Sequence, residues 1–501
     1  MFKKESLIRG SALSVVFNAI AKLLQVVNIF SVSIFFGANN NTDLFYFLLN
    51  LITITIAGFI SGMDATVIIP EFMRRRENVD LKKAMGFINK YVFIYLIIGV
   101  LFCCLGSIEP LKIYSTFSKF DVDTLTGNKV ILILCLPLLG LMLTTNLLSN
   151  VLMSHRYFTL PSIVNLINNF FSLFFLFLFF RQLKLVSILV GMLLGYFINL
   201  LILCYILKVK LKWRFGVVDW KFEKRIFRFI SNSQIVALIV SGRTYLTQFL
   251  LSGLSGGTLT AINWGGQISS IPETFINSQV YNVMGVKFSE DFARNEVNKS
   301  IDLFRRVFFI LLIVTGACIT FLFLCSTQIA SLLNFRNKVS GETMDILVRS
   351  IKYLSLIPFI NIITFLVSKL LAATQKISFR FVVYSFIGQV ALLALIVLLV
   401  GTNGYLGYIM ATVLGFSIIA LLNFLLMGQY FNFAIVKRTA LSFFYVLFSL
   451  VVLVMIVRYI DSVLHMSSRN TFAYVFFVLV VVFIFSFLNL KKHVSAFRKS
   501  L

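Results

Sequence analysis

Charge is scarce in this sequence, and acidic charge is the scarcest. Only 13% of the 501 residues are charged, with 19 acidic against 45 basic residues, whereas a soluble domain carries roughly 25% charged residues. The three histidines are scattered, the six cysteines form no CxxC pair, and no glycine-rich loop leads into a Lys-Ser or Lys-Thr pair. The sequence therefore predicts no metal site, no disulfide framework, no nucleotide-phosphate loop and no separate soluble domain.

Apolar residues dominate instead. They make up 59% of the chain, phenylalanine alone accounts for 56 residues, and the mean hydropathy is +0.95. Apolar runs of roughly 20 residues are long enough to cross a bilayer as helices. We expect an all-α polytopic membrane protein with fourteen spans, at about 10–36, 43–69, 85–106, 129–153, 159–180, 185–206, 226–252, 258–285, 303–326, 345–373, 379–400, 404–428, 440–460 and 472–489.

The basic residues gather in alternate loops, which predicts the orientation. Cytoplasmic loops carry the excess of Lys and Arg in membrane proteins, so both termini are expected in the cytoplasm of a bacterial inner membrane. The first run continues to Phe36 without a small-residue cleavage site and predicts an uncleaved first span. The net charge of +26 is then a topology signal that faces anionic lipid, and no nucleic acid is expected as a partner.

An internal repeat organises the chain. The stretch from Phe36 to Asp80 has a polar loop, a long apolar run and a charged loop, and a similar order recurs from Ser255 to Asn298. Such symmetry is typical of transporters built from two related bundles. We expect two pseudo-symmetric six-helix lobes, 1–207 and 229–428, joined by a basic amphipathic linker on the membrane surface at 208–228, with Trp213 and Trp220 at the interface. Two further spans occupy 429–501.

Basic residues inside spans are the first candidates for a binding site, because charge within a membrane is costly and therefore usually functional. Arg243 lies in the seventh span, Lys22 in the first and Lys369 in the tenth. Arg243 and Lys22 are expected to face one cavity, with Thr244 and Gln248 adding polar contacts. Structural ion pairing, snorkelling or helix–helix hydrogen bonding is the alternative.

Acidic residues inside spans are candidates for a gate or for ion coupling. Asp43 lies at the outer mouth of the second span, where it is expected to cap that helix, to latch a gate against Arg243, or to do both by turns. Asp64 and Glu273 lie at corresponding places in the second and eighth spans, where each is expected to bind a coupling proton or sodium ion, or to pair with a basic neighbour.

The FGA-x4-D-x-F pattern at 36–45, the 62–70 stretch and Arg243 before a Gly-rich turn resemble the MviN/MurJ family. That family belongs to the multidrug/oligosaccharidyl-lipid/polysaccharide exporter superfamily. The resemblance implies a fourteen-span flippase whose last two spans hold a polyprenyl tail. The sequence departs from the family in having Asn28 and Ile56 where two cavity arginines are expected, and Gly266-Gln267 where an Asp-Arg pair is common.

The resemblance and the cationic spans together predict a transporter, not an enzyme. It would move a polyprenyl-diphosphate-linked saccharide such as lipid II across the membrane by alternating access. Membrane potential or an ion gradient, with no cofactor, would drive it. Membrane lipid and cell-envelope synthesis enzymes are the expected partners of a monomer. The alternatives are a flippase for a surface-polysaccharide repeat unit, a drug/cation antiporter of the same superfamily, and a membrane polysaccharide polymerase.

Overall fold

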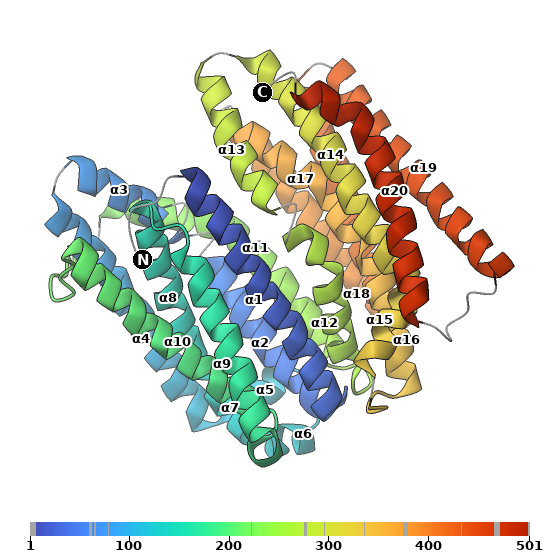
Figure 1. Cartoon of the computed structure of the whole chain (residues 1–501). Coiled ribbons are helices and arrows are strands. Elements are labelled where there is room, and N and C mark those ends of the chain that lie inside the picture. Colours follow the sequence, from blue (N-terminus) through green and yellow to red (C-terminus); the bar gives the residue numbers. More distant parts are fainter. Residues whose placement is uncertain are drawn as a thin grey trace. The chain divides into compact units, whose positions relative to one another are not determined.

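The protein is all-helical throughout the part of the chain that the structure describes. The computed structural model describes residues 7–59, 63–64, 67–78, 80–221, 223–274, 278–294, 296–334, 336–373, 379–431, 433–464 and 471–498. Every regular element in these ranges is a helix (Figure 1). The chain divides into two compact units, Met1–Thr260 and Ala261–Leu501.

The first unit holds the N-terminal helices, and α11 belongs to it. Its helices are α1 (Leu7–Phe36), α2 (Asn40–Phe59), α3 (Ile69–Asn78), α4 (Leu81–Ile108), α5 (Pro110–Phe117), α6 (Val122–Gly127), α7 (Lys129–Leu134), α8 (Leu136–Ser154), α9 (Leu160–Leu183), α10 (Val186–Leu211) and α11 (Lys224–Leu251). Helix α9 packs between α1 and α10, α4 packs on α8, and α11 packs on α2. The predicted seventh span, α11, therefore shares a unit with the first six.

The second unit is built around α14 (Figure 1). After α12 (Thr258–Ser269), which begins at the end of the first unit, it contains α13 (Ser278–Ala293), α14 (Val297–Leu324), α15 (Ser326–Leu333), α16 (Gly341–Leu354), α17 (Leu356–Ala373), α18 (Phe379–Tyr430), α19 (Phe433–Leu464) and α20 (Thr471–Arg498). Helices α17, α19 and α20 all pack against α14. The two predicted appended spans, α19 and α20, are thus anchored on this central helix.

The two units repeat one order of elements, as the internal repeat predicts. Helix α2 is followed by π-helical turns at 63–64 and 67–68 and then by α3, and helix α12 is followed by a π-helical turn at 273–274 and then by α13. An eight-residue helix then follows the next long helix in each unit, α5 in the first and α15 in the second. The repeated stretch therefore covers these helices and turns in each unit.

Nine helices in the described ranges are long and apolar enough to span a membrane. One of them, Val383–Gln429, covers two expected spans, which are separated by a kink at Gly404, where φ has the non-helical value of 54° inside α18. The expected spans that fall outside this set are the second, seventh, eighth and fourteenth. The first three carry Asp43, Asp64, Arg243 and Glu273, and each of them includes residues whose backbone or side chain lies outside the described part of the chain. The chain is a multi-pass membrane protein, and the count of fourteen spans stays a prediction.

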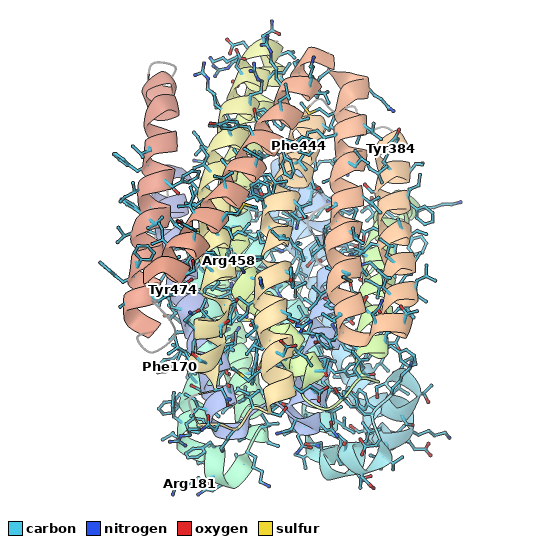
Figure 2. The ribbon with its side chains drawn as sticks, turned by 90° about the vertical axis from the view of Figure 1, so that its right-hand side faces the viewer. Phe170, Arg181, Tyr384, Phe444, Arg458 and Tyr474 are labelled. Carbon is cyan, nitrogen blue, oxygen red and sulfur yellow. The ribbon has the colours of Figure 1, made fainter. Side chains whose placement is uncertain are left out.

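Large apolar side chains on the helix surfaces fit a lipid-facing exterior. Phe444 of α19 is 64% exposed and Phe170 of α9 is 50% exposed, and both project from their helices (Figure 2). Tyr474 of α20, by contrast, is 6% exposed and packs in an apolar cluster with α14. Exposed phenylalanines of this kind are expected where the solvent is hydrocarbon.

The linker between the sixth and seventh spans differs from expectation. Residues 212–221, which we call the strap, are non-helical, and Lys212 begins them with a positive φ of 51°. Trp213 is 3% exposed and packs in the core of the first unit, so its predicted place at the membrane interface is wrong. Trp220 is 53% exposed and contacts Phe93. The strap is held by the protein itself.

Candidate functional site

The Asp43 carboxylate binds the start of helix α12, which lies far away in the sequence. Its Oδ2 accepts a hydrogen bond from the Gly257 amide at 2.7 Å, and its Oδ1 accepts one from the Thr260 amide at 2.7 Å. Asp43 is 3% exposed, and both amides belong to the first unit. The first N–H groups of a helix lack partners within the helix and favour a negative charge. Asp43 therefore fixes the turn that ends in α12.

The prediction that Asp43 caps its own helix is wrong. Helix α2 is capped by Asn39, whose Oδ1 accepts from two first-turn N–H groups at 3.0 and 3.2 Å. Asparagine is a favourable N-cap residue because its side-chain oxygen reaches these otherwise unpaired donors. Because Asn39 caps α2, the Asp43 carboxylate, one turn later, can bind the start of α12 instead. A gate formed by Asp43 and Arg243 stays a prediction.

Helices α2 and α11 are joined by polar contacts along their antiparallel faces. The Asn50 amide donates to Gln248 Oε1 at 3.3 Å, and the Ser241 hydroxyl lies 3.5 Å from the Ile54 carbonyl oxygen. At Gly58 an added Cβ would come within 2.9 Å of the Ser241 hydroxyl. The polar residues of the seventh span thus serve in part to join two helices, which was the alternative to a cavity lining.

Arg243 lies in the last third of α11 and is half-buried. Its Nη2 lies 3.3 Å from the Thr244 hydroxyl, which donates to the Val240 carbonyl at 2.8 Å. Lys22 is also half-buried, in the middle of α1, and both cations belong to the first unit. Arg243 in α11 and Lys22 in α1 therefore place two positively charged side chains inside helices of the first unit.

The two positions that depart from the family pattern are filled without charge. The Asn28 amide donates to the Ser172 hydroxyl of α9 at 2.8 Å. Ile56 is 4% exposed and packs in the core of the first unit. Neither place offers a cation to a phosphate group.

Asp64 is buried completely and faces Tyr95. The Tyr95 hydroxyl of α4 donates to Asp64 Oδ1, and both residues are 0% exposed. The other carboxyl oxygen, Oδ2, has no hydrogen-bond partner in the described part of the chain. Asp64 itself lies in the π-helical turns between α2 and α3. Irregular helix turns of this kind are frequent at functional sites.

In the second unit, Glu273 occupies the corresponding irregular turn and is half-buried. Lys369 of α17 is also half-buried, and its stem lies against α13, since a Cβ at Gly285 would come within 3.2 Å of its Cδ. Gln267 of α12 donates to Asn263 on the same helix at 2.5 Å. The roles of Glu273 and Lys369 stay predictions.

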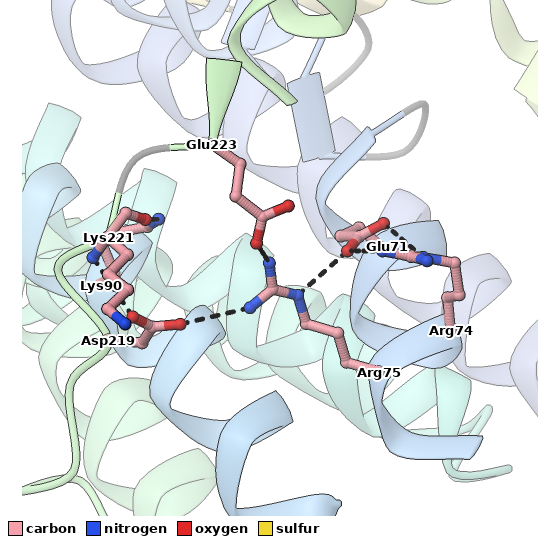
Figure 3. A network of polar contacts seen from close by, with 7 residues as sticks. All are labelled: Glu71, Arg74, Arg75, Lys90, Asp219, Lys221 and Glu223. Atoms are coloured by element: carbon pink, nitrogen blue, oxygen red, sulfur yellow. Dashed lines mark hydrogen bonds and ion pairs between the residues drawn. The ribbon is translucent and has the colours of Figure 1, made fainter. Parts of the chain in front are cut away.

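A charged cluster that the sequence did not predict lies where α3, α4 and the strap meet (Figure 3). Arg75 of α3 is its centre. Its guanidinium donates to Glu71 at 3.0 Å, to Asp219 at 3.3 Å and to Glu223, and it stacks 4.4 Å from the Phe87 ring. We call Arg75 with Glu71, Asp219 and Glu223 the Arg75 clasp.

Helix α4 holds the same strap through a second set of bonds. Lys90 donates to the Lys221 carbonyl at 2.8 Å (Figure 3). Asn89 donates to two strap carbonyls at 2.7 Å each, and its oxygen accepts from Trp213 at 2.8 Å. Since α11 begins at Lys224, directly after the clasp, the strap fixes where that helix starts.

The clasp sets the charge state of Glu71. Burial alone would raise the pKa of this carboxyl, but hydrogen bonds and charge from Arg74 and Arg75 outweigh burial and hold the pKa below its usual range. Arg74 binds Glu71 through two bonds, at 2.7 and 2.8 Å, while its own side chain is 49% exposed. Glu71 therefore remains ionised at neutral pH.

Comparison with known proteins gives the family. The family model described as lipid II flippase MurJ matches residues 32–483. A search of curated proteins finds no match. The solved structure titled lipid II flippase MurJ, inward closed conformation, is similar with a TM-score of 0.79 at 15% identity, covering 96% of this chain and 100% of that one.

Solved structures of other MOP superfamily transporters share the fold at lower TM-scores. An inward-facing multidrug resistance MATE family transporter of the MOP superfamily has a TM-score of 0.66 at 13% identity, covering 86% of this chain and 99% of its own. A MOP superfamily transporter from Pyrococcus furiosus, whose title reports reversed polarity of the binding pocket, has a TM-score of 0.61 at 13% identity, covering 87% and 97%. Together with the family model, these folds indicate a transporter rather than a catalytic enzyme. The chain belongs to the lipid II flippase MurJ family.

Proposed function

We propose that this protein moves a lipid II-like polyprenyl-diphosphate-linked saccharide from the inner to the outer leaflet of the membrane. Family membership over residues 32–483 is the observation that carries the proposal. Arg243 and Lys22 supply positive charge inside the spans, and a planar guanidinium binds phosphate oxygens through two bonds. In this proposal the diphosphate binds at Arg243, with Thr244 and Gln248 contacting the headgroup.

Transport would follow alternating access between two lobes, with both termini in the cytoplasm and the polyprenyl tail remaining in lipid along the last two spans. Lys369 adds a cation in the second lobe. Asp43 would act at the outer gate, since its bonds to the Gly257 and Thr260 amides tie α2 to the start of α12. Asp64 and Glu273 would bind the coupling ion, because each lies at an irregular helix turn.

Genetic rescue tests the substrate. The chain is expressed in a bacterium depleted of its own lipid II flippase, and survival is measured for the native protein, for Arg243→Ala and for Arg243→Lys. Arg181→Ala, at the exposed end of α9 (Figure 2), is the control. We expect survival with the native chain and with Arg181→Ala, loss with Arg243→Ala, and partial recovery with Arg243→Lys. Lysis with a well-expressed native chain would reject lipid II as the substrate.

A surface-polysaccharide repeat unit is the second candidate substrate. The uncharged side chains of Asn28 and Ile56 favour this candidate. With fewer positive side chains than the family pattern, the protein would suit a headgroup whose charges are arranged differently from those of lipid II. Rescue of a strain that lacks its surface-polysaccharide flippase, combined with failure to rescue lipid II transport, would select this candidate.

A further inference from the structure

The environment of Asp64 suits a neutral carboxyl better than an ionised one. Its one hydrogen bond comes from Tyr95, and Oδ2 is buried without a partner in the described residues. Tyr95 and Met63, the neighbour of Asp64 in the chain, belong to the apolar core of the first unit, in which Ile68, Ile88 and Leu143 are fully buried. An isolated ionised carboxylate in such surroundings costs many kcal/mol, so the group takes up a proton instead.

The nearby charged groups do not offset that cost. Tyr91 and Tyr95, on the face of α4 toward Asp64, carry no positive charge. On α3, the Arg75 guanidinium is already bound by Glu71, Asp219 and Glu223. Asp64 therefore has no counter-charge of its own among these groups.

We propose that Asp64 is a proton-binding site, which holds a proton on Oδ2 in this conformation and releases it when this carboxyl becomes exposed to water. Tyr95 is a positioning residue, because its hydroxyl fixes Oδ1 as the hydrogen-bond acceptor and leaves Oδ2 for the proton. The step is a simple protonation: a hydronium ion gives up a proton, so that one of its O–H bonds breaks and water is left, while an O–H bond forms on Oδ2 and the carboxylate charge is lost.

A face of α4 connects this site with the Arg75 clasp. Phe87, Tyr91 and Tyr95 are spaced four residues apart, which places them along one face of the helix. Arg75 stacks on Phe87 at one end of this face, and Asp64 binds Tyr95 at the other. The π-helical turn at 67–68 leads directly into α3, which carries Arg75, and Asp64 lies only a few residues before this turn in the chain. Opening of the clasp end would therefore expose the carboxyl to water.

Infrared spectroscopy of the purified full-length protein tests the protonation without any substrate. A protonated carboxyl has a carbonyl stretching band that an ionised carboxylate lacks. We expect this band at neutral pH in the native protein, its loss in Asp64→Asn, and a shift in Tyr95→Phe because the hydrogen bond to Oδ1 is removed. Asp43→Asn is the matched control, since two backbone amides bind that carboxylate and favour its ionised form.

Absence of the band from the native protein, or its persistence in Asp64→Asn with no shift in Tyr95→Phe, would overturn the proposal. The shift in Tyr95→Phe keeps the test valid if Asp64→Asn does not fold. Proton coupling rests on the proposed function and has its own readout. In proteoliposomes, we expect a pH gradient to alter the rate of lipid-linked sugar transport by the native protein but not by Asp64→Asn.

A native protein that transports the lipid-linked sugar at a rate set by sodium and unaffected by the pH gradient would refute proton coupling. A native protein that shows the infrared band but transports no lipid-linked sugar would refute the proposed function alone. The two failures are therefore distinguishable.

Discussion

Replacing Arg75 with glutamine is expected to release the strap from α3. Two of the three clasp partners lie on or beside the strap: Asp219 is 31% exposed in its side chain and Glu223 is 44% exposed. A charge-assisted hydrogen bond contributes about 1.5–3 kcal/mol when buried, and an exposed ion pair contributes about 0–1 kcal/mol. Allowing for the solvent around both carboxylates, we expect the strap to lose about 2 kcal/mol, which is roughly a thirty-fold rise in its open population.

Limited trypsin digestion measures this opening, because cleavage of a transiently open segment follows the population of the open form when reclosing is fast. The strap contains Lys212, Arg214 and Lys221 as cleavage sites. We expect the strap of Arg75→Gln to be cleaved roughly thirty times faster than the strap of the native protein, while the helices remain uncut. Complete release is not expected, since Asn89 and Lys90 still bind strap carbonyls.

Arg74→Gln is the matched control for this experiment. Arg74 is the neighbouring residue on the same helix and shares Glu71 with Arg75, but none of its hydrogen bonds in Figure 3 reaches the strap. Its cleavage rate should therefore stay within about twofold of the native rate, as for other exposed ion pairs. Equal cleavage of Arg75→Gln and Arg74→Gln would refute the reasoning, because the strap would then be held by α4 alone.

Two further predictions concern pH and helix packing. The pKa of Glu71 is lowered below its usual 4.5 in the folded protein, so the stabilising effect of the ionised carboxylate is present above pH 4.5 and is lost as pH falls through the lowered pKa. Amide hydrogen exchange in the strap, corrected for intrinsic rates, should therefore rise as the pH falls over that range. The substitution Glu71→Gln should abolish this rise. Gly99→Val should lower the stability of the first unit by about 1–3 kcal/mol, because a Cβ at Gly99 would lie 2.6 Å from the Gly140 Cα. Thermal unfolding in detergent checks this loss, and Gly242→Ala, where a Cβ meets no atom within 4 Å, should unfold near the native temperature.

Local patterns in the sequence were enough to predict the class of the protein. Long apolar runs leave helices as the way to satisfy the backbone in lipid, and the observed long helices lie where those runs occur. The repeat of a polar loop, a long apolar run and a charged loop predicted the shared element order of the two units, but not the irregular turns within it. The same residues carried the resemblance to the family that the comparison now shows.

Partners across long sequence distances were decided by the tertiary structure alone. Asp43 was correctly expected at a helix start, but which helix it would bind depends on a turn more than 200 residues later. Trp213 was expected at the membrane interface because aromatic residues beside basic ones are typical there, yet Asn89 offers it a buried acceptor. The sequence places each polar group on a helix or in a loop. Only the packing of the helices decides which buried group becomes the partner of each polar group. Hydrogen bonds and ion pairs act over a few ångströms in space, whatever the separation of the two residues along the chain.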